Sequence, residues 1–152
     1  MKIRAAMETE AEVLSALAMR AKAHWRYADQ ALQQWQAQLA ISPADIRGKP
    51  TFVATIEDEI VGFYSLLPSG ESWDLDNLWV SPLFMRRGVG QALLEHALET
   101  AARGGATEVT VDADPNDEAF YLQCGAVRRG EVAAPIPGQP ERVRPQLAFR
   151  RK

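Results

Sequence analysis

The chain has 152 residues with a net charge of −3, and its composition, 47% hydrophobic and 24% charged, favours a single globular domain spanning residues 1–152. The acidic balance argues against a nucleic-acid partner, because domains that bind nucleic acid are usually basic. No apolar run approaches the ~18 residues of a membrane span and the charged N-terminus lacks a signal-peptide core, so we expect a cytoplasmic protein without membrane contact.

The N-terminal segment predicts an edge strand followed by a helix. Residues 1–6 suit a short strand, and Thr9 with Glu12 fits a capping box at the start of the helix. The apolar residues that follow at helical spacing are Val13, Leu14, Leu17, Ala18 and Ala21.

A second helix and a loop are predicted next. Asp29 can cap this helix through its side chain. The helix carries an apolar face formed by Leu32, Trp35 and Leu39. Residues 41–50 contain two prolines and one glycine, so we expect a connecting loop there.

Three strands are predicted in the middle of the chain. Residues 51–56 and 60–67 flank an acidic tripeptide and suit a hairpin. A Pro-Ser-Gly turn then leads into a third strand over residues 72–80.

The third strand is predicted to contain a bulge. By strict alternation Leu75 falls on the opposite side of the strand from Leu78 and Val80. One extra residue near Asp76 and Asn77 would bring all three apolar side chains onto one face.

The second half of the chain predicts a long helix, a strand, a short helix and two further strands. The long helix covers residues 88–103 and ends at a pair of glycines, and Val109 with Val111 marks the next strand. Asn116 can cap a short helix that stops at Gly125. The last two strands are predicted over residues 126–132 and 143–149.

These elements follow the order β-α-α-β-β-β-α-β-α-β-β. The order predicts an α/β (α+β) fold, in which a mixed central sheet of six to seven strands is flanked by about four helices. No internal repeat or low-complexity tract interrupts it, which agrees with a single domain.

The most informative segment joins the third strand to the long helix. It contains, in order, Arg86, Arg87, Gly88, Val89, Gly90 and Gln91. The glycines allow the backbone to approach a ligand closely, and the helix start presents unpaired N–H groups and a positive dipole end. Two adjacent arginines beside such a helix start predict a site for a phosphate-bearing ligand.

This segment resembles the pyrophosphate loop of the GNAT superfamily of acyl-CoA N-acyltransferases, whose signature is Gln/Arg-x-x-Gly-x-Gly/Ala. Both glycine positions match, whereas Met85 stands where the family usually has Gln or Arg. Residues 119–126 resemble the second family signature, Ala-x-Tyr-x-x-x-Gly-Phe, with Ala126 in place of the aromatic residue. The resemblance covers essentially the whole chain and implies a GNAT-like fold.

The resemblance also implies an enzyme with a defined donor. A GNAT protein of this kind is an N-acetyltransferase that moves an acetyl group from acetyl-CoA, its co-substrate, directly to a primary amine of a small molecule or a peptide. The loop holds the CoA pyrophosphate, and the preceding strand end pairs with the pantetheine arm. The residues implied to contact acetyl-CoA are Leu78, Trp79, Val80, Arg86, Arg87, Gly88, Val89, Gly90, Gln91, Asn116 and Tyr121.

Catalytic and acceptor residues follow from the same resemblance. Tyr121 is expected to protonate the departing thiolate, because a phenol with a pKa near ~10 suits that leaving group. Asp76 is our choice of general base and Asp74 is the other candidate, although both carboxylates could simply occupy the solvent face of a strand. The candidates for contact with the acceptor amine are His24, Trp25 and Tyr27.

Two other interpretations remain. Gly88 and Gly90 are followed by Asp112 at about the spacing of a Rossmann dinucleotide site, but Leu93 replaces the third glycine and the loop after Val80 is too long. A non-catalytic acyl-CoA-binding or interaction domain on the same fold is the second interpretation.

The sequence also bears on metal binding and on the oligomeric state. The two histidines and Cys124 show no metal-ligand spacing, so we expect no metal. A C-terminal strand after a long loop could support a homodimer. The acceptor itself is not predicted, because acceptor pockets are built from variable loops.

Overall fold

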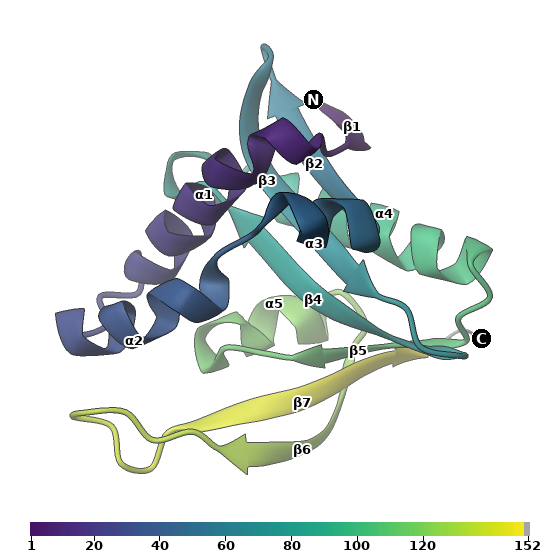
Figure 1. The fold of residues 1–152 in the computed structure, drawn as a ribbon. Coiled ribbons are helices and arrows are strands. Elements are labelled where there is room, and N and C mark those ends of the chain that lie inside the picture. The colour runs from purple at the N-terminus through teal and green to yellow at the C-terminus, as the bar shows by residue number, and fades with distance from the viewer. Residues whose placement is uncertain (151–152) are drawn as a thin grey trace.

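The computed structural model describes residues 1–150, which form one seven-stranded sheet with helices on both faces (Figure 1). The sheet order is β1-β2-β3-β4-β5-β7-β6, and all neighbouring strands are antiparallel except the parallel pair β4 and β5. This confirms the predicted mixed sheet. The strands are β1 (Lys2–Ala5), β2 (Thr51–Ile56), β3 (Glu59–Leu67), β4 (Ser72–Val80), β5 (Glu108–Asp112), β6 (Val127–Ala133) and β7 (Val143–Arg150).

The helices form two layers around the sheet. They are α1 (Ala11–Ala23), α2 (Asp29–Leu39), α3 (Pro43–Gly48), α4 (Val89–Arg103) and α5 (Glu118–Gln123). On one face, Leu14 and Leu17 of α1 pack on Phe63 of β3. On the other face, Leu93 and Tyr121, from α4 and α5, belong to the larger core. Figure 1 shows α1, α2 and α3 in front of the sheet and α4 behind it.

Two predicted helix starts are wrong. A 3-10 turn over Glu8–Glu10 precedes α1, and the Glu10 carboxylate accepts a 2.8 Å hydrogen bond from the backbone N–H of Met7, so the capping role predicted for Thr9 falls to Glu10. Asp29 is the first residue of α2 and not its cap, since the cap position belongs to Ala28, whose methyl side chain cannot accept a hydrogen bond.

The loop predicted over residues 41–50 is also wrong in part, because it contains α3. Ser42 and Asp45 form a reciprocal capping box: the Ser42 hydroxyl accepts from the Asp45 N–H at 3.0 Å, and the Asp45 carboxylate accepts from the Ser42 N–H at 2.9 Å. Pro43 occupies the first helical turn, where its missing N–H costs nothing. The proline that suggested a loop therefore starts a helix.

The bulge predicted in β4 is confirmed. Ser65 of β3 pairs with Asn77, and the next residue of β3 pairs with Leu75, which leaves Asp76 as the extra residue. Leu75, Leu78 and Val80 consequently all pack into the core on the α4 side. The residues between them face the α1 side, where the polar residues of the strand collect.

The turns at the ends of α4 and before α5 complete the fold. Gly88 is the N-cap of α4 with a φ of 81°, a left-handed conformation that glycine adopts without strain, and Gly104 follows its last turn. Asn116 does not cap a helix as predicted, because it lies inside a 3-10 turn, Pro115–Asp117, that Asp114 caps by accepting from the Asn116 N–H. Within residues 1–150 no helix has the length and apolar character that a membrane span requires.

Candidate active site

The two parallel strands β4 and β5 separate at the centre of the sheet. They are joined by only three residue pairs, of which the last is Asp74 with Thr110. Beyond Asp74, β4 stays paired with β3, and β5 stays paired with β7. The edge of β4 that faces β5 therefore presents unpaired backbone N–H and C=O groups from the bulge to Val80, which an extended ligand can pair with as an added strand.

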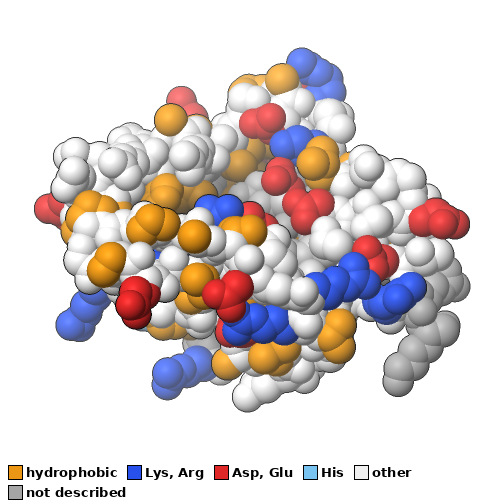
Figure 2. Space-filling model, turned by 90° about the horizontal axis from the view of Figure 1, so that it is seen from below, with side chains coloured by type: hydrophobic (Ala, Val, Ile, Leu, Met, Phe, Trp, Pro, Cys, Tyr) orange, Lys and Arg blue, Asp and Glu red, His pale blue; other side chains and the backbone are white. Residues whose placement is uncertain are grey.

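A cleft of about 550 Å³ opens beside this separation on the α1 side. Residues from β4, from the end of β5, from α2 and from the loop before β7 line it. Its charged lining residues are Lys22, Asp45, Lys49, Asp74, Asp76, Asp112, Asp114, Asp117, Arg142 and Arg144. Figure 2 views the molecule from below, and on this face acidic and basic side chains are interspersed while hydrophobic ones gather over one side.

Asp74 and Asp76 both line the cleft but differ in their partners. Asp76 forms an ion pair with Lys49 at 3.0 Å. Asp74 is half-buried, and in the described part of the chain it has no cationic partner; it accepts a 2.9 Å hydrogen bond from the Thr110 hydroxyl. Burial raises the pKa of the Asp74 carboxyl, the Thr110 hydrogen bond opposes this effect, and the charges of Asp76 and Asp112 add to it. Asp74 is thus a carboxyl with a raised pKa in a setting without a compensating cation in the described residues.

Tyr121 reaches the cleft from the opposite side, out of α5. Its side chain is buried in the core between Phe120 and Phe149, yet it also lines the cleft. Among residues 1–150 its hydroxyl has no hydrogen-bond partner. Burial, reinforced by the charges of Asp117 and Cys124, raises the pKa of the Tyr121 phenol, so the phenol keeps its proton at neutral pH.

The arginine–glycine loop leads into α4 as the sequence predicts. Arg86 and Gly88 both have positive φ values, 62° and 81°. Arg87 lies over the ring of Phe84 at 5.0 Å, while Arg86 and Gly88 are exposed. The first N–H groups of α4 have no side-chain cap, so they are free to bind an anion.

The loop and α5 lie close together across the end of β4. A Cβ placed on Gly90 would lie 3.4 Å from Cζ of Phe120 and 3.6 Å from Cγ2 of Val80. The two segments that carry the motifs therefore meet at one end of the separated strands, with the unpaired edge of β4 between them.

Comparison with known proteins identifies this arrangement. Residues 14–126 match the acetyltransferase (GNAT) family, which is well over half of the chain. The chain belongs to the GNAT family. It is therefore an acyltransferase that depends on acyl-CoA for the group it transfers.

Solved structures agree with this GNAT assignment in fold. A GCN5-related N-acetyltransferase from Rhodopseudomonas palustris is 24% identical, with a TM-score of 0.80 over 98% of this chain and 94% of that one. YjaB from Escherichia coli is 27% identical, with a TM-score of 0.70 over 99% and 98% of the two chains. The PaiA N-acetyltransferase from Thermoplasma acidophilum, solved in complex with coenzyme A, is 15% identical with a TM-score of 0.79 over 98% of each chain. No curated protein matches the sequence.

The three residues predicted to contact the acceptor do not line the cleft of this GNAT domain. His24 and Trp25 are exposed and contact each other edge-on, with ring centroids 5.1 Å apart. Tyr27 is buried behind the cleft wall, where its hydroxyl contacts the Asp114 carboxylate at 2.8 and 2.9 Å. The wall itself includes Trp35 of α2 and Ile41 beyond it.

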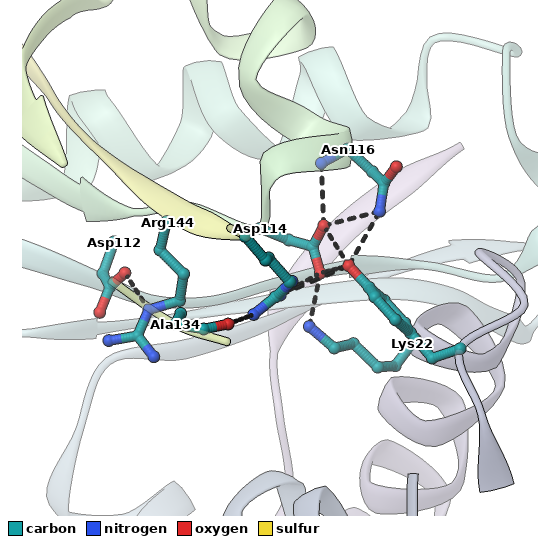
Figure 3. Close-up of polar contacts among 8 residues, drawn as sticks. Lys22, Asp112, Asp114, Asn116, Ala134 and Arg144 are labelled. Atoms are coloured by element: carbon teal, nitrogen blue, oxygen red, sulfur yellow. Dashed lines mark hydrogen bonds and ion pairs between the residues drawn. The ribbon is translucent and has the colours of Figure 1, made fainter. Parts of the chain in front are cut away.

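A buried polar cluster next to this wall was not predicted from the sequence. Asp114 lies at its centre, 2.5 Å from Nζ of Lys22 and 3.5 Å from a terminal nitrogen of Arg142 (Figure 3). Asn116, predicted to contact CoA, donates from Nδ2 to the Tyr27 hydroxyl and to Asp114, both at 2.9 Å. Burial alone would raise the pKa of Asp114, but the Lys22 charge and the hydrogen bonds to the carboxylate outweigh it and lower that pKa.

One member of the cluster had a signal in the sequence. Lys22 follows Leu14 and Ala18 at intervals of four, which places it on the buried face of α1, where an unpaired lysine would be costly. That position alone indicates a buried carboxylate partner. Arg142 lies in the loop between β6 and β7, and nothing in its local pattern indicates that it folds back to α1.

Proposed function

We propose that this GNAT protein transfers an acetyl group from acetyl-CoA directly to a primary amine while both are bound. One observation carries the proposal: Asp74 and Tyr121 line the same cleft at the point where β4 and β5 separate. A base and an acid thus flank the place where a donor bound along β4 ends.

The donor side of the opening has the chemistry that CoA requires. The unpaired edge at Leu78, Trp79 and Val80 offers hydrogen bonds to the amides of pantetheine. The Arg86–Gln91 segment offers backbone N–H groups, the α4 dipole and two guanidinium groups to the pyrophosphate. Met85 adds no charge there, and the backbone supplies the main contacts.

Asp74 serves as the base in this proposal, in preference to Asp76. It accepts a proton from the bound ammonium, directly or through a water, and leaves a neutral amine. Its raised pKa suits this transfer, whereas Asp76 is already neutralised by Lys49. The amine lone pair then forms the new N–C bond as the carbonyl π electrons move to oxygen, where a backbone N–H of the β4 edge stabilises the negative charge.

Tyr121 completes the transfer. When the carbonyl re-forms, the C–S bond breaks and its electron pair leaves with the sulfur of CoA. The Tyr121 hydroxyl, which has no other partner among residues 1–150, donates its proton to that thiolate. The nitrogen releases its second proton to solvent, the amide product and free CoA leave, and proton exchange with solvent restores the Tyr121 hydroxyl and the Asp74 carboxylate.

A thiol-release assay with acetyl-CoA and two acceptor panels, primary amines and peptides with a free N-terminus, tests the proposal. Turnover with either panel supports it and shows which kind of acceptor is used. Binding of acetyl-CoA by calorimetry without thiol release to any acceptor would instead favour a non-catalytic acyl-CoA-binding domain on this fold.

A further inference from the structure

The buried cluster links Asn116, which the family resemblance assigns to CoA, with Lys22 of α1 and through it with Trp35 of α2. We infer that Tyr27 and Asp114 are positioning residues that couple CoA binding at Asn116 to the order of the acceptor wall formed by α1 and α2. The inference rests on the proposed function, and it takes from the family resemblance that Asn116 contacts CoA. It goes beyond that function in assigning a role to two residues that the proposed chemical steps do not use.

Asn116 is oriented so that it can bind CoA without leaving the cluster. Both Nδ2 hydrogens are committed, one to the Tyr27 hydroxyl and one to the Asp114 carboxylate, each at 2.9 Å. A carboxylate accepts only, so the amide nitrogen must face it and the amide oxygen must point away. Figure 3 shows this oxygen directed out of the cluster, and the residue is exposed. The oxygen is free to accept a hydrogen bond from an amide N–H of pantetheine.

Such a hydrogen bond strengthens the cluster. A donor on the amide oxygen polarises the whole amide group and makes its N–H groups better donors, because hydrogen bonds in series reinforce one another. The two affected bonds lead directly to Tyr27 and Asp114. The sign of the coupling follows: CoA bound at Asn116 tightens the cluster.

Two hydrogen bonds of the cluster are long enough to shorten when the cluster tightens. Arg142 lies 3.4 Å from the Tyr27 hydroxyl and 3.5 Å from Asp114, both long for hydrogen bonds. Its Nε is buried without a hydrogen-bond partner in the described part of the chain. The guanidinium is therefore only partly satisfied, and a small inward shift would improve its contacts.

The acceptor wall depends on the same groups. Trp35 of α2 packs edge-on against the Tyr27 ring, with centroids 4.8 Å apart, and lies 4.2 Å from Nζ of Lys22. Among the described residues Ala31 is the one buried residue of α2, and Leu39 at the end of the helix packs against the smaller core, so the contacts of Trp35 anchor the middle of the helix. Lys22, Trp35 and Arg142 all line the cleft. A more rigid cluster therefore holds Trp35, and with it the α2 part of the wall, in a more fixed position.

Hydrogen exchange of α2 with and without CoA tests the inference in the full chain, and it requires no knowledge of the acceptor. With CoA at saturation, confirmed by calorimetry, we expect amides of Asp29–Leu39 to exchange about 5-fold or more slowly. In Tyr27→Phe the ring stays against Trp35 but the hydroxyl is lost, so CoA still binds, with lower affinity, while the slowing in α2 falls below about 2-fold.

Tyr64→Phe is the matched control. Tyr64 is also fully buried and its hydroxyl contacts His96 and Thr100 on the α4 side, so this variant loses a comparable buried hydroxyl outside the cluster. It should keep the CoA-dependent protection of α2. Equal protection of α2 in Tyr27→Phe and the wild type would overturn the coupling.

Two further outcomes separate the coupling from the function on which it rests. Failure of the wild-type chain to bind CoA removes the proposed function, and the inference with it. Unchanged CoA affinity in Asn116→Ala overturns the coupling alone, because it shows that CoA does not engage the residue from which the coupling starts.

Discussion

Asp74 and Thr110 are the last paired residues of β4 and β5, and the hydroxyl of Thr110 donates a 2.9 Å hydrogen bond to the carboxylate of Asp74. The strands separate immediately beyond this pair, so the carboxylate lies at the apex of the opening. The position combines partial burial, which makes the group more basic, with access to the cleft. Those are the two properties that a general base requires.

Asp74→Asn should lower kcat by about 100-fold or more, since it removes the proton acceptor while keeping the shape of the side chain. The reaction needs the ionised carboxylate, so the wild-type rate rises as pH rises through the raised pKa of Asp74. The variant should lose this rise in a pH profile of kcat/KM. Asp76→Asn is the control. A larger loss of kcat in Asp76→Asn than in Asp74→Asn would show that Asp76 is the base.

Thr110→Val should move the acid side of the pH profile without abolishing turnover. The Thr110 hydrogen bond lowers the pKa of Asp74, so its loss raises that pKa further and shifts the rise in rate to higher pH. The valine keeps the volume and β-branching of threonine. If the pH profile of the steady-state rate does not shift in this variant, Asp74 is not the group whose ionisation controls the rate.

Tyr121→Phe should lower kcat by about 100-fold while leaving the affinity for acetyl-CoA nearly unchanged. The ring keeps its contacts with Phe120 and Phe149, and only the unpartnered hydroxyl is lost. A thiol-release assay measures kcat, and calorimetric titration measures the affinity for acetyl-CoA. Wild-type turnover in this variant would exclude Tyr121 as the acid.

Gly88→Glu should weaken CoA binding by about 100-fold or more, because it adds strain at a φ of 81° and places a carboxylate beside the expected pyrophosphate. Gly70→Glu is the matched control: its φ is 56°, and, as at Gly88, no atom lies within 4 Å of an added Cβ, but it lies in the turn before β4. Calorimetric titration with CoA should show near wild-type affinity for the control. Similar losses in both variants would point to unfolding and not to the loop.

Asp117→Asn should stabilise the fold at neutral pH. Burial, with the charge of Asp114, raises the pKa of Asp117 from 3.8 to about 6. The folded state therefore holds the proton more tightly than the unfolded state, and ionisation destabilises the fold increasingly as pH rises from about 4 to about 6. The variant should gain about 1–3 kcal/mol in free energy of unfolding at pH 7.5 and nothing at pH 4, measured by urea titration. A gain that is the same at both pH values would contradict the titration of this group.

The side-chain alternation along a strand was the most predictable feature of this fold, because it must bring all apolar residues of the strand into one core. Strict alternation placed Leu75 on the wrong side of Leu78, and the only repair that keeps both in a core is an extra residue at Asp76, as observed. Helix caps were less predictable, because several adjacent polar residues could each cap. Ser42 and Asp45 satisfy the rule for a capping box, yet two prolines and a glycine within ten residues predict a loop, because a proline can both break a helix and occupy its first turn.

The candidate site divides in the same way. The loop around Gly88 and the position of Tyr121 could be predicted, because backbone conformation and a local motif specify both. The cluster around Asp114 could not be predicted, because its members are far apart in the sequence. Lys22 lies 92 positions from Asp114, Tyr27 lies 87 positions away and Arg142 lies 28 positions away. No local pattern contains contacts of that range.

The extra residue in β4 also has a consequence for comparing chains of this kind. It changes the phase of the strand, so that hydrophobic residues on both sides of it face one layer while Asp74 faces the other. Deleting Asp76 would restore a single phase and exchange the two faces for one half of the strand. In the proposed mechanism, the residue that meets the amine is thus set by the length of the strand as well as by its side chains. An alignment gap at this one position would separate chains that share both motifs but present a different side chain to the cleft.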